Sequence, residues 1–249
     1  MMEILAVKSN ENVSASASLW LMLLSRSALF FLAQVLFALV YLALGSAMAW
    51  DEAARWWPFF VVLGNIGSVF LLARLMQAEG GRYFDLLRFS RATLKQDLLW
   101  LVCLSVIGLP VAAAPMNNLA ALLFGDPMAP VQMIFRPLPP LALTLSFLFP
   151  LTIAFAELPT YFGYVMPRLA KQLNNGWLAW LIAAFCLAAQ HCFLPLILDG
   201  RFVLWRLGMY LPFALFIGLA LKLRPSLLPY FAIIHALMDI STLAVYWMV

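Results

Sequence analysis

The sequence predicts an all-α fold, a polytopic bundle of transmembrane helices, and three observations support this. Apolar residues make up 65% of the 249 residues and charged residues only 10%, which is too little polar surface for a soluble globule. The mean hydropathy is +0.97. Five stretches lack Asp, Glu, Lys and Arg, and each is long enough to cross a hydrocarbon core of about 30 Å as a helix: 27–50, 56–73, 98–125, 137–156 and 172–198.

Seven membrane spans are expected, with eight as the alternative count. The sixth is the weakest, because its charge-free part is only 207–221 and Pro212 interrupts it, so we expect it to be tilted or partly interfacial. No internal repeat or long linker divides the chain, so residues 1–249 are expected to form one integral membrane domain. The expected spans are about 19–49, 57–76, 98–114, 141–167, 177–198, 203–221 and 227–248.

The Lys and Arg residues predict the orientation and exclude a nucleic-acid partner. The net charge is +4, but the basic residues lie at the ends of apolar segments and form no patch. Cytoplasmic loops of membrane proteins collect Lys and Arg, so we expect a cytoplasmic N-terminus in the cell membrane, which is the inner membrane in a bacterium. Arg26, near the start of the first span, is expected to snorkel to the interface. One side carries Arg55, Arg136, Arg201 and Arg206, and the other carries Lys8, Arg26, Arg74, Arg82, Arg88, Arg91, Lys95, Arg168, Lys171, Lys222 and Arg224.

Three weaker signals concern the segments around the spans. Residues 82–96 interleave aromatic and Leu residues with basic ones at roughly helical spacing, which indicates a helix on the anionic inner leaflet, with a plain basic loop as the alternative. The first 18 residues lack a signal-peptide cleavage pattern, so no cleaved signal peptide is expected. The cysteines lie in apolar segments without metal-type spacing, so no disulfide framework is expected.

Four Glu, Asp or His residues fall inside predicted spans: Glu157, His191, His235 and Asp239. Such side chains cost several kcal/mol in a membrane unless they are paired or hydrated, so they are candidate functional residues. At a rise of 1.5 Å per residue, they lie about 16, 21, 13 and 20 Å from the cytoplasmic helix ends, respectively. His235 and Asp239 also share one helix face. We therefore expect one shared site near the middle of the membrane.

Three short motifs surround these residues. The segment AELPTYFGYVMPRL at 156–169 is similar to an EExxxRGY motif and places Glu157 on its first Glu. LAAQH supplies His191 of an FxxxH motif, and HALMD supplies His235 and Asp239 of an HxxxN or HxxxD motif. In this order the motifs resemble the CAAX protease and bacteriocin-processing family (CPBP or Abi), which includes the type II CAAX prenyl endopeptidases. The resemblance covers roughly residues 141–245.

Two positions depart from the family pattern. Leu158 stands where the second Glu is usual, and Phe162 stands where the Arg is usual. Positions four apart share a helix face, so the usual residues could form an ion pair, and here both partners are replaced together. Exchange of a buried ion pair for apolar residues is often neutral or stabilising. We interpret the exchange as structural, leaving Glu157 in place.

The same segment contains a proline and two tyrosines near Glu157. A proline inside a helix frees the carbonyl four residues earlier, so Pro159 could free that of Phe155 and permit a local bend. The alternative, favoured for this proline taken alone, is an ordinary proline of a membrane helix. Tyr161 and Tyr164 share the face of Glu157, and we interpret them as packing residues.

The resemblance implies an intramembrane endopeptidase of the glutamate type that acts on a peptide or lipidated-protein substrate. Glu157 and His191 are then expected to hold and deprotonate water, and His235 to donate to the oxyanion. Asp239 is either kept protonated by burial or orients His235 and stabilises its imidazolium form, and the second role is preferred. No cofactor and no metal are expected.

Three other functions are compatible with the same residues. One is a catalytically silent scaffold or binding protein in the bilayer, for example in bacteriocin immunity. A second is a zinc site built from two His and two carboxylates, although no HExxH pairing is present. A third is a proton-coupled transporter, whose inverted halves the sequence does not show. The sequence leaves the oligomeric state open.

Overall fold

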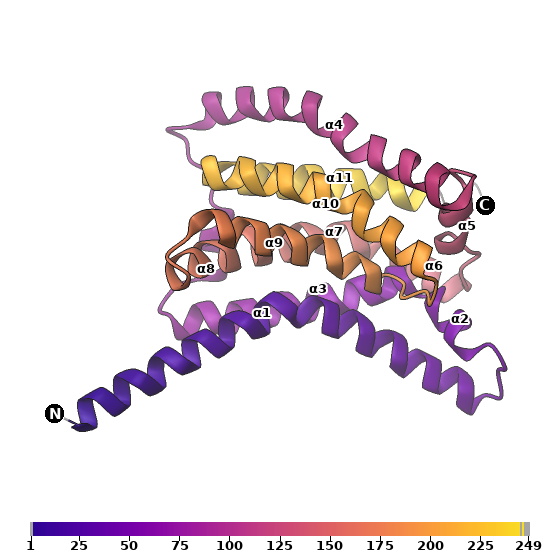
Figure 1. The fold of residues 1–249 in the computed structure, drawn as a ribbon, viewed down its shortest axis with the longest axis horizontal. Helices are drawn as coiled ribbons and strands as arrows, with labels where there is room; N and C mark the ends of the chain where they lie inside the picture. The colour runs from indigo at the N-terminus through magenta and orange to yellow at the C-terminus, as the bar shows by residue number, and fades with distance from the viewer. Residues whose placement is uncertain (1, 245, 247–249) are drawn as a thin grey trace.

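The structure, a computed structural model, describes residues 2–244 and 246, and the side chains of 18–244 and 246. This part of the chain is helical and contains no strand. Figure 1 shows the long helices side by side in one bundle, with the N-terminal part of α1 extending beyond it. The elements are α1 (Met2–Ala43), α2 (Ala49–Ala54), α3 (Trp57–Ala78), η1 (Tyr83–Leu87), α4 (Leu94–Phe124), α5 (Ala129–Ile134), α6 (Pro140–Ser146), α7 (Leu148–Leu158), η2 (Pro159–Val165), α8 (Met166–Gln172), α9 (Gly176–Gln190), η3 (His191–Phe193), α10 (Gly200–Leu223), η4 (Pro225–Leu227) and α11 (Leu228–Ala244).

The helix lengths confirm the all-α polytopic bundle. Within the described chain, six helical stretches are long and apolar enough to cross a membrane: Ser18–Ala43, Trp57–Ala78, Leu94–Phe124, Gly176–Phe193, Gly200–Leu223 and Pro225–Ala244. A seventh crossing is formed by Pro140–Ser146 and Leu148–Gln172 if they are taken as one span, bent by 50°. The chain is therefore an integral membrane protein by the length and composition of its helices.

Several span boundaries differ from those predicted. The first span ends at Ala43 and not near residue 49, because the chain turns at Gly45, whose φ is +83°. The third span is longer than 98–114, since α4 continues through its two prolines to Phe124. Pro212 does not interrupt the sixth span: α10 runs unbroken for 24 residues through it. Membrane helices tolerate proline where neighbouring groups compensate the lost hydrogen bond.

The predicted surface helix at 82–96 is not formed. The segment contains only the five-residue 3-10 helix η1, followed by an extended residue, Arg88, and a turn before α4 begins. Two contacts fix this short helix. The Asp85 carboxylate accepts a hydrogen bond from the Arg82 backbone N–H at 3.1 Å, and the Tyr83 hydroxyl donates to the Phe155 carbonyl at 2.5 Å. The segment is thereby tied to α7 as a loop.

The Tyr83 contact also accounts for the irregular helix that follows Glu157. Pro159 has no N–H to offer the Phe155 carbonyl, and the Tyr83 hydroxyl satisfies that carbonyl instead. Burial raises the pKa of the Tyr83 hydroxyl, which keeps it protonated as a donor. From Pro159 to Val165 the backbone forms a π-helix, an arrangement frequent at functional sites. The helix therefore changes to π geometry at Pro159, whereas the 50° bend of this span lies earlier, between Ser146 and Leu148.

Two hydrophobic cores lie at opposite ends of the bundle. The basic-face core, near the end that carries most Lys and Arg, includes Leu72, Tyr161, Leu169, Ala184, Leu221 and Phe231. The charge-poor-face core, near α2, α5 and α6, includes Phe30, Trp57, Phe149, Ile153, Phe202 and Trp205. On α1, α3, α7 and α9, several buried polar residues fall between the residues of the two cores. This polar layer contains Arg26, Asn65, Ser68, Glu157, Gln190 and His191.

Candidate active site

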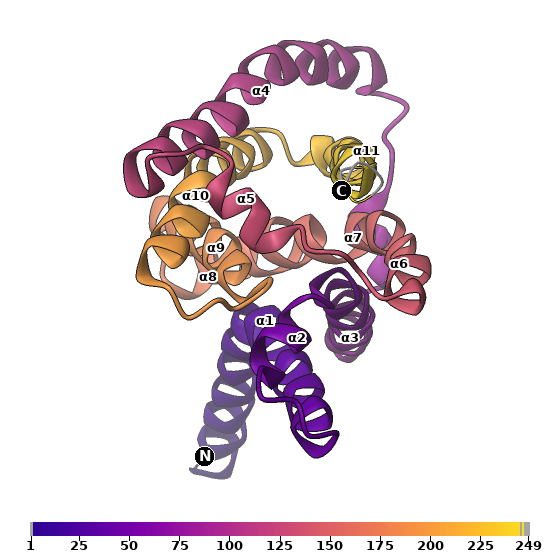
Figure 2. The same ribbon diagram turned by 90° about the vertical axis from the view of Figure 1, so that its right-hand side faces the viewer.

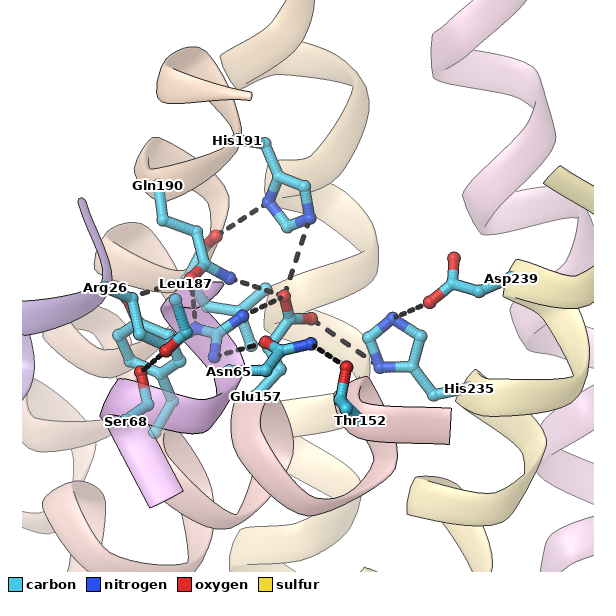
Figure 3. A network of polar contacts seen from close by, with 12 residues as sticks. Arg26, Asn65, Ser68, Thr152, Glu157, Leu187, Gln190, His191, His235 and Asp239 are labelled. Carbon is cyan, nitrogen blue, oxygen red and sulfur yellow. Dashed lines mark hydrogen bonds and ion pairs between the residues drawn. The ribbon is translucent and has the colours of Figure 1, made fainter. Parts of the chain in front are cut away.

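Three helical segments bring the four predicted site residues together in the polar layer. Glu157 lies near the C-terminal end of α7, His191 begins η3 directly after α9, and His235 and Asp239 lie on α11. Glu157 lies between the two imidazoles: its Oε2 is 3.7 Å from His191 Nε2, and its Oε1 is 3.6 Å from His235 Nδ1. Figure 3 shows both rings directed at this carboxylate. The residues are thus close enough to act on one ligand.

Exposure of the site increases toward α11. The Glu157 side chain is 4% exposed and His191 10%, whereas Asp239 is 16% and His235 21% exposed. The carboxylate of Glu157 is therefore the deepest ionisable group of the four. The pair on α11 forms the accessible side of the site.

The His191 ring has a defined tautomer. Its Nδ1 lies 2.9 Å from the carbonyl of Leu187, one turn earlier. A carbonyl can only accept, so Nδ1 carries the proton and Nε2 of the neutral ring is an acceptor. Nε2 and the Glu157 Oε2, 3.7 Å apart, are then two acceptors that face each other. A water molecule that donates one hydrogen to each would fit this spacing.

The His235 ring lies between the two carboxylates. Figure 3 shows its Nδ1 facing Glu157 and its Nε2 facing Asp239. The distance from Nε2 to Asp239 Oδ2 is 3.4 Å. Because the carboxylates lie on opposite edges of this ring, they do not converge with it on one metal position. No three His, Cys, Asp or Glu side chains in the described ranges are arranged to hold a metal ion.

Arg26 belongs to the site, and its predicted position at the interface is wrong. Its side chain is fully buried, with Nη2 3.7 Å from Glu157 Oε2. Its Nε donates to Gln190 Oε1 at 2.6 Å and its Nη1 to Asn65 Oδ1 at 2.9 Å. These partners come from α9 and α3 and hold the guanidinium at mid-bundle, where snorkelling is not needed. The positive charge balances that of Glu157 in the polar layer.

Gln190 connects Arg26 to the carboxylate. Its Nε2 donates to Glu157 Oε2 at 2.6 Å, while its Oε1 accepts from Arg26 and from the Tyr161 hydroxyl at 3.3 Å. On the other side, Asn65 Nδ2 donates to Thr152 Oγ1 at 2.9 Å. The network fixes the Glu157 carboxylate from the side opposite α11 (Figure 3).

Two polar atoms next to this network have no hydrogen-bond partner among the described residues. They are Arg26 Nη2 and Asp239 Oδ2, both buried. The first lies beside Glu157 and the second beside His235. Buried polar groups are normally satisfied, so these two atoms indicate unused capacity for a polar ligand on both sides of the site.

Arg206 holds the turn that carries His191. Its Nε donates to the His191 carbonyl at 3.1 Å and its Nη2 to the Leu194 carbonyl at 2.5 Å. The ring of Tyr210, one turn further along α10, stacks on the His191 imidazole with centroids 3.6 Å apart and planes within 16°. Backbone and ring of His191 are therefore both fixed by α10.

A cavity of about 320 Å³ adjoins the four residues. Glu157, His191, His235 and Asp239 lie along its polar part, together with Arg206. Its apolar walls include Trp57, Ile134, Phe149, Trp205 and Met209. A site of this size, mostly apolar with a few convergent polar groups, is typical of ligand binding.

The residues that depart from the family motif are packing residues. Leu158 and Phe162 are buried in the basic-face core. A Cβ at Gly218 of α10 would lie 2.6 Å from the Phe162 ring, so the ring occupies the space that this glycine leaves. The nearby Tyr161 and Tyr164 also belong to the core and not to the cavity walls. The hydroxyl of Tyr164 donates to Glu79 Oε1 at 2.6 Å.

The sequence analysis missed Arg26, Gln190 and Asn65. Amide side chains in apolar spans are a weak signal of hydrogen bonds between helices, and Gln190 precedes His191 directly. Arg26 was placed at the end of the first span because the charge-free stretch begins only at residue 27.

No protein-family model, no curated protein and no solved structure matches this chain. The fold and the site define an all-α polytopic membrane protein with a buried cluster of acid and imidazole groups. The family resemblance depends on the three motifs alone.

Proposed function

We propose that this chain is an intramembrane endopeptidase of the glutamate type, similar to the CPBP family. The observation that carries the proposal is the position of Glu157 between two imidazoles, at 3.7 and 3.6 Å, beside a cavity inside the bundle. The substrate is a peptide or lipidated protein associated with the bilayer. The N-terminus and the basic face are cytoplasmic, by the distribution of Lys and Arg.

In the proposed reaction, Glu157 Oε2 and His191 Nε2 orient a water molecule at the scissile carbonyl, and Glu157 accepts its proton as the C–O bond forms. His235 donates a hydrogen bond to the oxyanion, and Asp239 on its Nε2 side stabilises the imidazolium. The proton held by Glu157 then passes to the leaving amine, and the C–N bond breaks. Arg26 and Gln190 position the carboxylate.

The test is cleavage of a peptide library by purified protein in detergent. Glu157→Gln and His191→Ala should each lower kcat by about 10² to 10⁴. Glu79→Gln is the matched control, because Glu79 lies outside the site and pairs with Arg168. Retained cleavage by the two site variants would refute the water-activating pair. Loss of activity in strong chelator would favour zinc instead.

A catalytically silent binding protein is the second candidate. Hydrogen bonds through the polar layer join α1, α3, α7 and α9, as a purely structural cluster would. They are made by Arg26, Asn65, Thr152 and Gln190. Wild-type protein that binds a peptide partner without cleaving it would support this function. Comparison of membrane proteomes from wild-type and Glu157→Gln cells would show an accumulated precursor only if the protein is a protease.

A further inference from the structure

The cavity lies entirely on one side of the polar layer. On α7 it is lined by Phe149 and Ile153, which precede Glu157 on the way from the charge-poor face. On α3 it is lined by Trp57 and Val61, at the start of the helix. The short helix α5, at the same end of the bundle, contributes Ile134.

On α10 and α11, at the other side of the cavity, the lining residues also lie toward the charge-poor face. Its lining residues on α10, from Trp205 to Tyr210, belong to the half of that helix nearest the charge-poor face. On α11 they are His235, near the middle of the helix, and Asp239, Ser241 and Thr242 in its second half. The cavity thus extends from the four site residues toward the charge-poor face, between α10 and α11. Figure 2, which looks onto this end of the bundle, shows α5 and α11 there.

Toward the basic face the site is closed. Residues of the basic-face core, such as Leu158, Tyr161 and Leu187, lie directly beyond Glu157 and His191 and are buried. None of the described residues of that core lines the cavity. The cavity therefore does not extend into this core toward the basic face.

The charges distinguish the two faces. Arg26 and Arg206 both lie in the bundle interior, so neither counts toward a face. Without them, the basic face carries ten of the Lys and Arg residues assigned to it from the sequence, and the charge-poor face carries three. The asymmetry that makes the basic face cytoplasmic is thus kept. The cavity then belongs to the outer half of the membrane.

We infer that the site receives its substrate from the charge-poor, non-cytoplasmic face, through the cavity between α10 and α11, and that this substrate is an apolar peptide segment. The inference rests on the proposed function for its use of a peptide. The walls near that face are aromatic and aliphatic, with Trp57, Phe149 and Trp205 among them, and they match apolar side chains. The rim at α11 is accessible, since Ser241 is exposed.

The test is the reactivity of single cysteines with a charged, membrane-impermeant thiol reagent. The background lacks the three native cysteines, Cys103, Cys186 and Cys192, all of them free thiols. Thr242→Cys places a thiol on the cavity wall. Ala170→Cys is the matched control, because Ala170 is similarly half-buried and lines a second cavity at the basic face. Right-side-out and inverted membrane vesicles expose the two faces separately.

Thr242→Cys should react only in right-side-out vesicles and Ala170→Cys only in inverted ones, with at least tenfold selectivity in each case. An apolar peptide of Phe, Leu and Ala should slow the reaction of Thr242→Cys, and an equally long peptide of Ser, Glu and Lys should not. Reaction of Thr242→Cys from the basic face, or from neither face, would overturn the inferred route. Equal protection by both peptides would overturn the apolar substrate. Labelling requires no catalysis, so inactivity of the wild-type protein would refute the proposed function and leave the route standing.

Discussion

The guanidinium Nη2 of Arg26 lies 3.7 Å from the Glu157 Oε2, and both side chains are buried. Removal of one partner of a buried pair leaves an uncompensated charge, which costs about 3 to 5 kcal/mol. Arg26→Met should therefore destabilise the protein by this amount in detergent. Addition of Glu157→Gln should restore a large part of the loss, as measured by unfolding of the two single variants and the double variant.

The control for this cycle is Arg201→Met at the charge-poor face, where the arginine side chain is 62% exposed. Exposed ion pairs contribute about 0 to 1 kcal/mol, so this variant should unfold nearly as the wild type does. Strictly additive effects of Arg26→Met and Glu157→Gln would show that the two residues are not coupled.

The hydrogen bond from Tyr83 to the Phe155 carbonyl predicts a second stability effect. Tyr83→Phe leaves that carbonyl without a partner, because Pro159 has no N–H, and an unsatisfied buried group costs about 1 to 3 kcal/mol. The melting temperature in detergent should fall accordingly. Tyr230→Phe is the matched control: the Tyr230 hydroxyl is buried without a hydrogen-bond partner, so its removal should be neutral or stabilising. Equal effects of the two substitutions would contradict this account of the π-helix.

Signals local to the sequence predicted the membrane fold and the proximity of the four site residues. Apolar length identifies spans, and an ionisable residue deep in a span stands out whatever its partners are. The position of Arg26 could not be predicted in this way, because it depends on how α1 packs against Asn65 and Gln190 on two other helices. The side of the membrane on which the cavity lies follows from tertiary packing for the same reason.

Arg206 should affect catalysis through the position of His191. Two of its hydrogen bonds go to the carbonyls of His191 and Leu194, in the fork geometry of a guanidinium. Lys cannot reproduce this fork, so His191 should be displaced in Arg206→Lys. A displacement near 1 Å should lower kcat by about 10- to 100-fold, with little change in KM. Steady-state kinetics on a cleaved peptide would measure this. Arg201→Lys is the control, and wild-type kcat in Arg206→Lys would show that the turn holds without the fork.

The ion pair at the basic face predicts how stability depends on pH. Burial alone would raise the pKa of Glu79, but hydrogen bonds from Arg168 and Tyr164 lower the pKa below its usual value. A lowered pKa gives stability that is fully present above the ordinary glutamate pKa of about 4.3 and is lost as the pH falls through the lowered value. The Glu79 side chain is 43% exposed, so the contribution should stay below about 1 kcal/mol.

Glu79→Gln should remove this part of the pH dependence. The melting temperature of the wild type should fall more steeply between pH 5 and pH 3 than that of the variant, an interval chosen around the ordinary glutamate pKa of about 4.3. Identical slopes in the two proteins would mean that Glu79 titrates alike in the folded and unfolded states.

The contact between Phe162 and Gly218 predicts the effect of refilling this part of the core. A Cβ at Gly218 would lie 2.6 Å from the Phe162 ring and 3.0 Å from Trp180, so Gly218→Leu should cost about 1 to 3 kcal/mol through overpacking. Phe162→Ala alone should cost about 3 to 5 kcal/mol through the space that it leaves. In the double variant the new leucine occupies part of that space, so the combined loss should be smaller than the sum. Gly200→Ala is the control, since nothing lies within 4 Å of its Cβ position. A Gly218→Leu variant as stable as this control would refute the role of Phe162 as the side chain packed against Gly218.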